Sequence, residues 1–324
     1  MLLNDLLLSY SKGAHLNRTR KPKSDLRQLS TEQILPAARD LDRKSSLEIV
    51  RLINDEDATV AAAVRRALPQ IARAVDVVVA GLRHGGRLIY VGAGTSGRIA
   101  ALDASEIPPT FNTDPHTVQY IMAGGTRALG ASTEASEDDT GLAVKEIRKR
   151  SPGKHDIVLG IASSGRTPFT IAALEYARRR GARTIALTCN RNSPLERAAD
   201  FAIVTEVGPE VLAGSSRMKA GTAHKMVLNM ISTGAMTRLG YVYGNLMVSV
   251  WTKNEKLIQR AIRIVEQATG ADHRTASHAL AASRNRTPVA VVMLAAGVTR
   301  TQAVAALKRT KGHVRQAIAS AGCV

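Results

Sequence analysis

The strongest indication of the fold is in residues 87–98, Arg87-Leu88-Ile89-Tyr90-Val91 followed by Gly92-Ala93-Gly94-Thr95-Ser96-Gly97-Arg98. The first five form a short apolar run of the kind found in strands buried on both faces. The turn that follows has the pattern GxGxxG at the start of a helix, where free backbone N–H groups and the helix dipole bind phosphate. We therefore predict a strand, a phosphate-binding turn and a helix, in that order.

Four further apolar runs resemble this strand, at residues 117–122, 156–161, 183–187 and 201–204. Segments long enough for a helix separate most of them, such as residues 140–150 and 168–180. Strands that alternate with helices in this way indicate a parallel sheet covered on both faces, and hence an α/β fold. Ligands of such sheets bind beyond the carboxyl ends of the strands, where the unusual residues of this chain fall.

A second glycine loop follows the third run. It combines hydroxyl groups with a glycine and a helix-starting proline, in Ser163, Ser164, Gly165, Thr167 and Pro168. A serine that only caps a helix explains one such loop equally well. The first loop, with Gly94, Thr95, Ser96 and Gly97, also fits a dinucleotide site, but no Asp or Glu follows the second strand to hold a ribose. Two hydroxyl-rich loops at neighbouring strands favour a phosphosugar over a nucleotide.

Two acidic segments lie close to these loops in the sequence. Glu106 precedes Pro108-Pro109, where we expect the helix to end. A carboxylate near a helix C-terminus is mildly unfavourable, which draws attention to Glu106, although a solvated surface residue is the simpler interpretation. Glu137 precedes Asp138-Asp139, and acidic residues at a helix start are favourable without any further role.

A third hydroxyl-rich segment opens a long helix that we predict from Ser215 to Leu239. Ser215, Ser216 and Lys219 could complete an anion pocket, while a capping serine followed by surface bases explains the same residues. The eight histidines form no HExxH motif and no His/Cys pair, so the sequence predicts neither a metal site nor a cofactor.

Positive charge is concentrated at the two ends of the chain. Lys plus Arg number 45 against 27 Asp plus Glu, a formal net charge of +18 that would suit a nucleic-acid partner. Residues 1–30 account for +4 and residues 253–324 for +9, which leaves only +5 for residues 31–252. The chain has only 10 aromatic residues on which single strands could stack, and this disfavours nucleic-acid binding.

These patterns divide the chain into four predicted parts. Residues 1–30 form a flexible basic leader, residues 31–86 form helices, residues 87–252 form the α/β domain and residues 253–324 form a small helical module. No apolar run approaches the roughly 20 residues of a membrane span, and Cys189 and Cys323 make no disulfide framework. We therefore expect a cytoplasmic protein with no membrane partner.

The chain resembles the N-acetylmuramic acid 6-phosphate etherase family, a bacterial group within the sugar-isomerase (SIS) domain superfamily. The resemblance runs from about Thr31 into the C-terminal region. It rests on residues 53–57, 92–98, 102–110, 162–168, 214–222, 244–248 and 254–257. The two glycine loops alone would indicate only an SIS domain, whereas residues 102–110 and 214–222 are specific to the etherases.

The resemblance implies an SIS-type, flavodoxin-like α-β-α sandwich with a five-stranded parallel sheet, a UBA-like C-terminal module and a homodimer in the bacterial cytoplasm. It implies cleavage of the lactyl ether of N-acetylmuramic acid 6-phosphate to N-acetylglucosamine 6-phosphate and D-lactate. The acids of the family that match Glu106 and Glu137 carry the active-site chemistry.

This ether can be cleaved by elimination of lactate followed by addition of water, and both steps need proton transfers that two carboxylates can perform. Ring opening exposes the C1 aldehyde and acidifies the C2 hydrogen, so a base can remove that proton while an acid protonates the lactyl oxygen. We assign the C2 proton to Glu137, and the ether oxygen and then water to Glu106. Two alternatives stay open at this point, a non-catalytic phosphosugar-binding regulator and a phosphosugar isomerase with the same loops.

Overall fold

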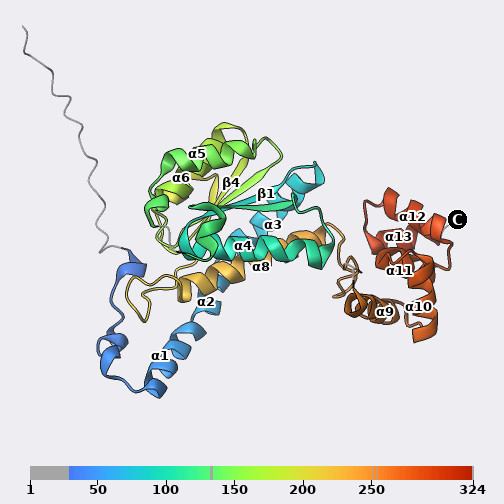
Figure 1. The fold of residues 1–324 in the computed structure, drawn as a ribbon, viewed down its shortest axis with the longest axis horizontal. Helices are drawn as coiled ribbons and strands as arrows, with labels where there is room; N and C mark the ends of the chain where they lie inside the picture. Colours follow the sequence, from blue (N-terminus) through green and yellow to red (C-terminus); the bar gives the residue numbers. More distant parts are fainter. Residues whose placement is uncertain (1–28, 132–133, 251, 253, 323–324) are drawn as a thin grey trace, which may run out of the picture.

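The protein is described by a computed structural model that covers residues 29–131, 134–250, 252 and 254–322. Its sheet has five parallel strands in the order β2-β1-β3-β4-β5, which is the order of flavodoxin-like folds (Figure 1). The strands are β1 (Leu88–Gly92), β2 (Val118–Met122), β3 (Ile157–Ile161), β4 (Arg183–Thr188) and β5 (Phe201–Val204). All five predicted strands are confirmed, and the predicted leader lies outside the described residues except for its last two.

Helices cover both faces of the sheet. The helices α3 (Leu68–Arg83), α4 (Gly94–Phe111) and α8 (Lys219–Arg238) lie on one face, and α5 (Thr140–Lys149) and α6 (Pro168–Arg179) lie on the other (Figure 1). The short α7 (Pro194–Ala198) connects β4 to β5. Alternate residues of one strand enter different cores, since Tyr90 packs with the first group and Ile89 and Val91 with the second. The strands are therefore apolar throughout, as their sequence indicates.

The N-terminal segment forms short 3-10 turns at Ser30–Glu32, Pro36–Ala38 and Leu41–Arg43, followed by α1 (Ser46–Ala58) and α2 (Val60–Arg66). A capping box fixes the start of α1, because the Ser45 side chain accepts from Glu48 N while the Glu48 side chain accepts from Ser45 N. No residue of α1 is buried, and the helix projects from the body of the molecule (Figure 1).

The C-terminal helices form a separate body beside the sandwich (Figure 1). They are α9 (Glu255–Thr269), α10 (His273–Ala282), α11 (Thr287–Ala296), α12 (Arg300–Arg309) and α13 (Val314–Ala321). Their apolar core also contains Val248 and Val250, which precede α9. Among the described helices none alone is long and apolar enough to cross a membrane, and the pair α11 and α12 meets that test only jointly, across a bend of 108°.

Two helix boundaries differ from the prediction. The helix α4 continues past Pro108 and Pro109 to Phe111, because burial of Ile107, Pro108 and Phe111 offsets the missing backbone donors. Glu106 therefore lies within α4 and not at its end. The helix α8 begins at Lys219 and not at Ser215, because the carboxylate of a residue nine positions before Lys219 caps it. Glu210 accepts hydrogen bonds from the backbone N–H groups of Lys219 and Ala220 at 2.9 and 3.0 Å.

Candidate active site

The first predicted loop lies where the chain direction across the sheet reverses, because β1 pairs with both β2 and β3. The N-cap of α4, Ala93, provides no side-chain hydrogen bond to the first turn. Gly94 has a φ of +52°, a left-handed conformation that L side chains rarely adopt. The backbone N–H groups at the start of α4 are thus left without a side-chain cap, as a phosphate site requires.

The Glu137 carboxylate lies against this loop. Glu137 ends the 3-10 turn Glu134–Glu137, and a methyl group placed on Gly94 would lie 3.0 Å from Glu137 Oε1. The following residues hold the turn in place, since the Asp139 side chain accepts from Leu142 N at 2.8 Å and caps α5. The structure therefore brings Glu137 to the phosphate-binding loop, across 43 residues of sequence.

The second predicted loop is fixed from beneath by neighbouring strand ends. The Ser163 carbonyl accepts hydrogen bonds from the Thr188 hydroxyl at 3.2 Å and the Asn190 amide at 2.9 Å. Gly165 has a φ of +66°, and a methyl group there would lie only 2.3 Å from Ser193 Oγ. Thr167, the N-cap of α6, makes no side-chain capping bond, so this helix start is also uncapped by its own residue. Because Gly92 of β1 pairs with Ile161 of β3, the two loops leave the sheet side by side.

The third predicted segment reaches the first loop through a glycine of α8. A methyl group on Gly221 would lie 3.4 Å from Thr95 Cγ2 and 3.6 Å from the Ser216 carbonyl oxygen. The structure therefore brings Ser216 close to Thr95. Lys219 differs from its neighbours, because its side chain is only 3% exposed and its ammonium bonds Glu56 of α1 at 2.5 Å. The positive charge of Lys219 is compensated inside the protein.

Sequence reasoning missed four residues at this end of the sheet. Asn190 follows β4, and its amide bonds Thr31 Oγ1 at 3.1 Å and the Ser163 carbonyl. Its side-chain oxygen accepts from Ser30 N at 2.9 Å, which ties the N-terminal segment to the second loop. Glu32 lies close by, since a methyl group on Gly214 would lie 3.3 Å from Glu32 Oε2. The position of Asn190 after a strand was a usable signal, whereas nothing local to residues 30–32 indicates this contact.

A buried polar chain lies behind the first loop. Ser96 Oγ is 3.4 Å from His224 Nδ1, and His224 Nε2 is 3.7 Å from Cys189 Sγ. Burial lowers the pKa of His224 to about 4 and raises the pKa of the Cys189 thiol to about 12. Both groups are therefore neutral near pH 7, and His224 connects Ser96 to Cys189 without carrying a charge.

Glu106 is the one predicted catalytic residue that the structure leaves apart from the loops. It is exposed, and within the described part of the chain it makes no hydrogen bond or ion pair. It lies 12 positions after Gly94 on α4, which corresponds to about 18 Å at 1.5 Å per residue. A single copy of the chain therefore presents Glu137 at the loops and Glu106 elsewhere.

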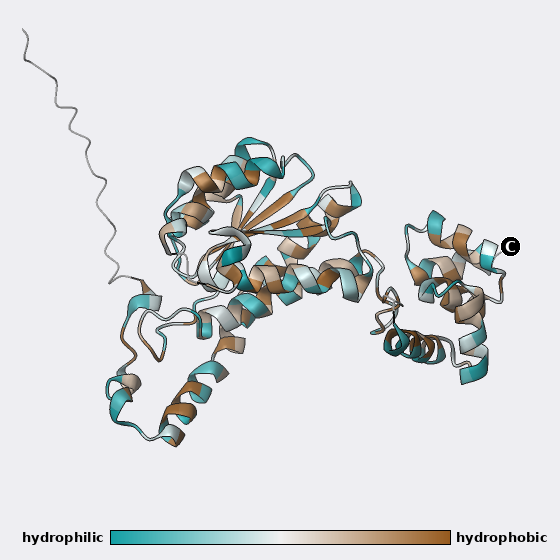
Figure 2. Ribbon diagram, viewed as in Figure 1, coloured by the Kyte–Doolittle hydropathy of each residue, from teal (hydrophilic) through white to brown (hydrophobic). Residues whose placement is uncertain are grey.

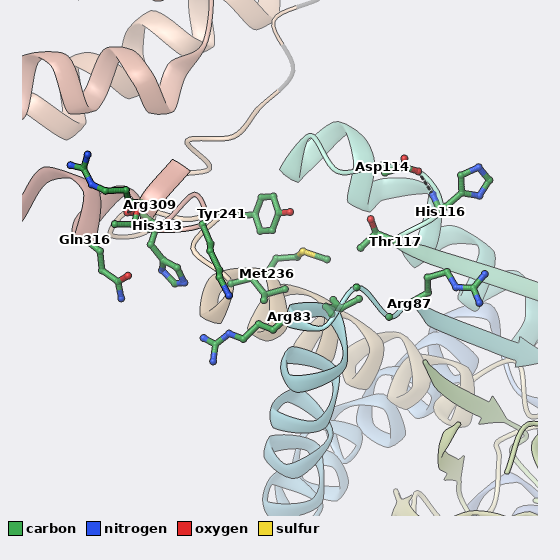
Figure 3. Close-up of a pocket in the computed structure, with 16 residues that line it drawn as sticks. Arg83, Arg87, Asp114, His116, Thr117, Met236, Tyr241, Arg309, His313 and Gln316 are labelled. Atoms are coloured by element: carbon green, nitrogen blue, oxygen red, sulfur yellow. Dashed lines mark hydrogen bonds between the residues drawn. The ribbon is translucent and has the colours of Figure 1, made fainter. Parts of the chain in front are cut away.

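A cavity of about 720 Å³ lies at the opposite, amino end of the sheet, between β1, β2 and the C-terminal helices (Figure 3). Arg83, Arg309, Lys311 and His313 line it, and Asp114 is its one acidic lining residue. None of the predicted site residues lines this cavity. The described residues also contain no group of three or more His, Cys, Asp or Glu side chains placed to hold a metal ion.

Comparison with known proteins finds two family models that match parts of this chain. A family model described as the glucokinase regulatory protein N-terminal SIS domain matches residues 70–178, and one described as the SIS domain matches residues 151–233. The solved structure of a phosphoheptose isomerase from Francisella tularensis is 21% identical, covers 60% of this chain and 100% of its own, and has a TM-score of 0.49.

Curated relatives are similar along most of the chain. The N-acetylmuramic acid 6-phosphate etherase of Streptomyces avermitilis is 48% identical over 306 residues, which cover 94% of this chain and 98% of the relative. The protein of that name from Symbiobacterium thermophilum is 54% identical over 275 residues, which cover 85% and 91% of the two chains. The chain belongs to the N-acetylmuramic acid 6-phosphate etherase family.

Proposed function

We propose that this protein cleaves the lactyl ether of N-acetylmuramic acid 6-phosphate, giving N-acetylglucosamine 6-phosphate and D-lactate. One observation carries the proposal together with the family membership. Two glycine- and hydroxyl-rich loops leave adjacent strands, and the carboxylate of Glu137 lies beside the first of them. This arrangement combines an anion site with a proton-transfer group within the length of one sugar.

The phosphate of the substrate would bind between the loops. The binding residues we propose are Gly94, Thr95, Ser96, Gly97, Ser163, Ser164, Gly165, Thr167, Ser215 and Ser216. The starts of α4 and α6 lack side-chain caps, so their backbone N–H groups can donate to phosphate oxygens, with the hydroxyl groups as further donors. Lys219 acts indirectly in this scheme, because its bond to Glu56 joins α1 to the start of α8.

The reaction we propose is an elimination followed by a hydration. In the open-chain aldehyde, a base takes the proton from C2, the electron pair forms the C2–C3 double bond and the C3–O bond breaks. The departing lactyl oxygen takes a proton from an acid. Water then adds at C3 of the unsaturated aldehyde and a proton returns to C2, so the net change is the addition of one water molecule.

Two carboxylates suffice for these proton transfers. We assign removal and return of the C2 proton to Glu137, and protonation of the lactyl oxygen followed by deprotonation of water to Glu106. Each positioned acid or base contributes about 10²- to 10⁴-fold to the rate. The assignment of Glu137 agrees with its position beside Gly94.

The active species we propose is a homodimer in the cytoplasm. On α1, which projects from the sandwich, Leu47 is 55% exposed and Val50 is 57% exposed. Figure 2 shows hydrophobic residues along this helix, and none of the residues of α1 is buried within the same chain. A second copy would bury this surface. The reduced, buried Cys189 is in keeping with an intracellular location.

Supplying N-acetylmuramic acid 6-phosphate and measuring lactate tests the function. We expect equal amounts of lactate and N-acetylglucosamine 6-phosphate, and in heavy water the sugar product should carry deuterium at C2. An isomerase or a binding regulator would release no lactate. Lactate release without deuterium at C2 would exclude the elimination pathway while retaining the overall activity.

Substitution of Glu137 tests the site itself. Glu137→Gln should reduce kcat about 10²- to 10⁴-fold because the amide cannot accept the C2 proton. Glu175→Gln is the matched control, because Glu175 is an exposed glutamate on α6. Equal activity of the two variants would contradict the role of Glu137. Circular dichroism and thermal melting of both variants would show that the fold is intact.

A further inference from the structure

Basic side chains from both bodies of the molecule line the cavity at the amino end of the sheet (Figure 3). Arg83 lines it from the end of α3, and Arg309 and Lys311 line it from the end of α12 and the turn that follows. Arg83 donates to the Arg238 carbonyl at 3.2 Å, but within the described part of the chain none of the three forms an ion pair. Basic residues near helix C-termini are favourable by themselves, yet here they converge from two bodies on one cavity of about 720 Å³.

The other charges around the cavity do not offset these three. Asp114 is its one acidic lining residue, and it accepts a hydrogen bond from His116 N at 2.7 Å. Arg87 also lines the cavity, but Asp156 at 2.7 Å compensates its guanidinium. The lining therefore has an excess of positive charge, to which residues 253–324 add with their net charge of +9.

An apolar surface and a hydroxyl group complete the lining. Met236, Leu239 and Tyr241 line the cavity at and after the end of α8. Figure 3 shows Met236 and the Tyr241 ring between the C-terminal helices and Thr117. The Tyr241 hydroxyl makes no hydrogen bond to a described residue, and burial raises its pKa, so near pH 7 it is protonated and available as a donor.

The two bodies also touch each other beside these groups. A methyl group on Gly240 would lie 2.6 Å from the His313 ring, so the start of α13 packs against the turn after α8. Across this contact the pKa of His313 is lowered, first by burial and then by the Arg83 charge. The two bodies therefore present like charges to each other, and an anion between them would replace repulsion with attraction.

We propose that this cavity binds a small phosphorylated molecule whose remaining part is aromatic or aliphatic. Arg83 and Arg309 present guanidinium groups, which suit pairs of phosphate oxygens, and Lys311 adds a compact positive charge. The apolar part of the ligand would lie against Met236 and Tyr241. Side chains hold the phosphate here in place of helix N-termini, so this site differs in kind from the loops at the carboxyl end. Its volume is within the range of about 300–1,000 Å³ that is usual for small-molecule sites.

The His313 ring reports occupation of this cavity and not of the active site. NMR titration of the full-length protein at constant ionic strength, without and with pyrophosphate, measures the His313 pKa, and His313→Gln assigns the signal. A bound anion favours the protonated imidazole, so we expect pyrophosphate to raise this pKa. Pyrophosphate bound only at the loops of the opposite end would leave the His313 pKa unchanged, and that result would overturn the inference.

Calorimetric titration with pyrophosphate and with ADP identifies the binding residues. Arg83→Gln and Lys311→Gln should each weaken the binding of both ligands tenfold or more, because each removes a charge-assisted hydrogen bond. Lys308→Gln is the matched control, since it removes the same charge from the last turn of α12 but lies outside the cavity. Equal weakening in Lys308→Gln and Lys311→Gln would indicate unspecific attraction and would overturn the site.

Two further measurements complete the test. ADP should bind more tightly than pyrophosphate, because only ADP has a part that covers the apolar surface; equal affinities would contradict the aromatic or aliphatic part of the ligand. The three variants should release lactate with the kcat and KM of the wild type when no ligand is added, since their side chains lie at the end of the sheet opposite to the loops. A loss of this basal activity would show that the cavity is not a separate site.

Discussion

The two ends of the same sheet differ in the chemistry that they present. At the carboxyl end, glycines and hydroxyl groups follow β1 and β3, and two helices begin there without side-chain caps. At the amino end, Arg87 bonds Asp156 at 2.7 Å, and basic residues line the cavity beside the C-terminal helices. Every crossover helix of a parallel sheet starts at the carboxyl end, so only that end gathers helix N-termini. The basic side chains at the amino end therefore do not form a phosphate site of this kind, because no helix N-termini converge there.

Charges at the amino end are also balanced or dispersed. Burial alone would raise the pKa of Asp156, but hydrogen bonds from Arg87 and the Gly153 N–H, together with the Arg87 charge, lower it. Burial and then the nearby Arg83 lower the pKa of His313 across the cavity. The carboxyl end therefore suits a phosphate that is bound by backbone groups, and the amino end is organised by ion pairs and charge repulsion.

The largest effect should come from adding a methyl group beneath the second loop. Gly165→Ala combines a φ of +66° with a contact of 2.3 Å to Ser193 Oγ, so we expect it to lower the free energy of unfolding by more than about 2 kcal/mol and to raise KM. Gly181, before β4 at the amino end, has a φ of +84° but open space around its Cα. Gly181→Ala should cost only about 1 kcal/mol and leave KM unchanged. Urea unfolding measures the free energy of unfolding of both variants, and lactate assays measure their KM. Equal effects of the two substitutions would contradict a special role of the second loop at the carboxyl end.

Acid should weaken the carboxyl end through His224. Its pKa is about 4 in the folded protein and about 6.5 when unfolded, so the unfolded state binds more protons between these values. Stability is therefore lost as pH falls, by about 2 to 3 kcal/mol between pH 7 and pH 4.5 from this group. Urea unfolding of the wild type and of His224→Gln at both pH values isolates the contribution. A pH-dependent loss that is the same in both proteins would show that His224 does not cause it.

A smaller effect should follow from the loss of one hydroxyl group in the first loop. Thr95→Val keeps the shape of the side chain but removes a donor to phosphate, which is worth about 1.5 to 3 kcal/mol when the acceptor is charged. We expect KM for the substrate to rise tenfold or more, because about 1.4 kcal/mol of lost binding energy corresponds to a factor of ten. Thr117→Val at the amino end is the control, because Thr117 lines the other cavity. Similar KM values for the two variants would indicate that the first loop does not bind the phosphate.

The smallest effect should appear at the amino end. Arg83→Gln should raise the pKa of His313, because it removes the second of the two causes that lower this pKa, while burial remains. Titration of the histidine ring by NMR measures the change, and kcat/KM should not alter. Arg263→Gln on α9 should leave the His313 pKa as it is, since Arg263 lies outside the cavity. An unchanged His313 pKa in Arg83→Gln would mean that the two charges do not face each other.

Much of the fold was predictable, because its signals are local. The five strands are continuous apolar runs, and their burial on both faces follows from that composition. The helix boundaries at Glu106 and Ser215 were wrong, since both depend on packing and hydrogen bonds that the helix sequence does not show. Packing of Phe111 and Ile107 extends α4 through two prolines, and the Glu210 carboxylate replaces a serine as the cap of α8.

The parallel sheet and the two glycine loops could be predicted from the amino-acid sequence, because strand periodicity and turn chemistry are properties of neighbouring residues. Family membership follows from the sequence as well. Which side chains meet at the loops depends on the tertiary structure. It brought Glu137 to Gly94, Asn190 to Ser163 and Lys219 into an ion pair, and it left Glu106 on an exposed face of α4. Contacts of this kind depend on how the crossover connections return to the sheet, and residues far apart in the chain carry no local trace of them.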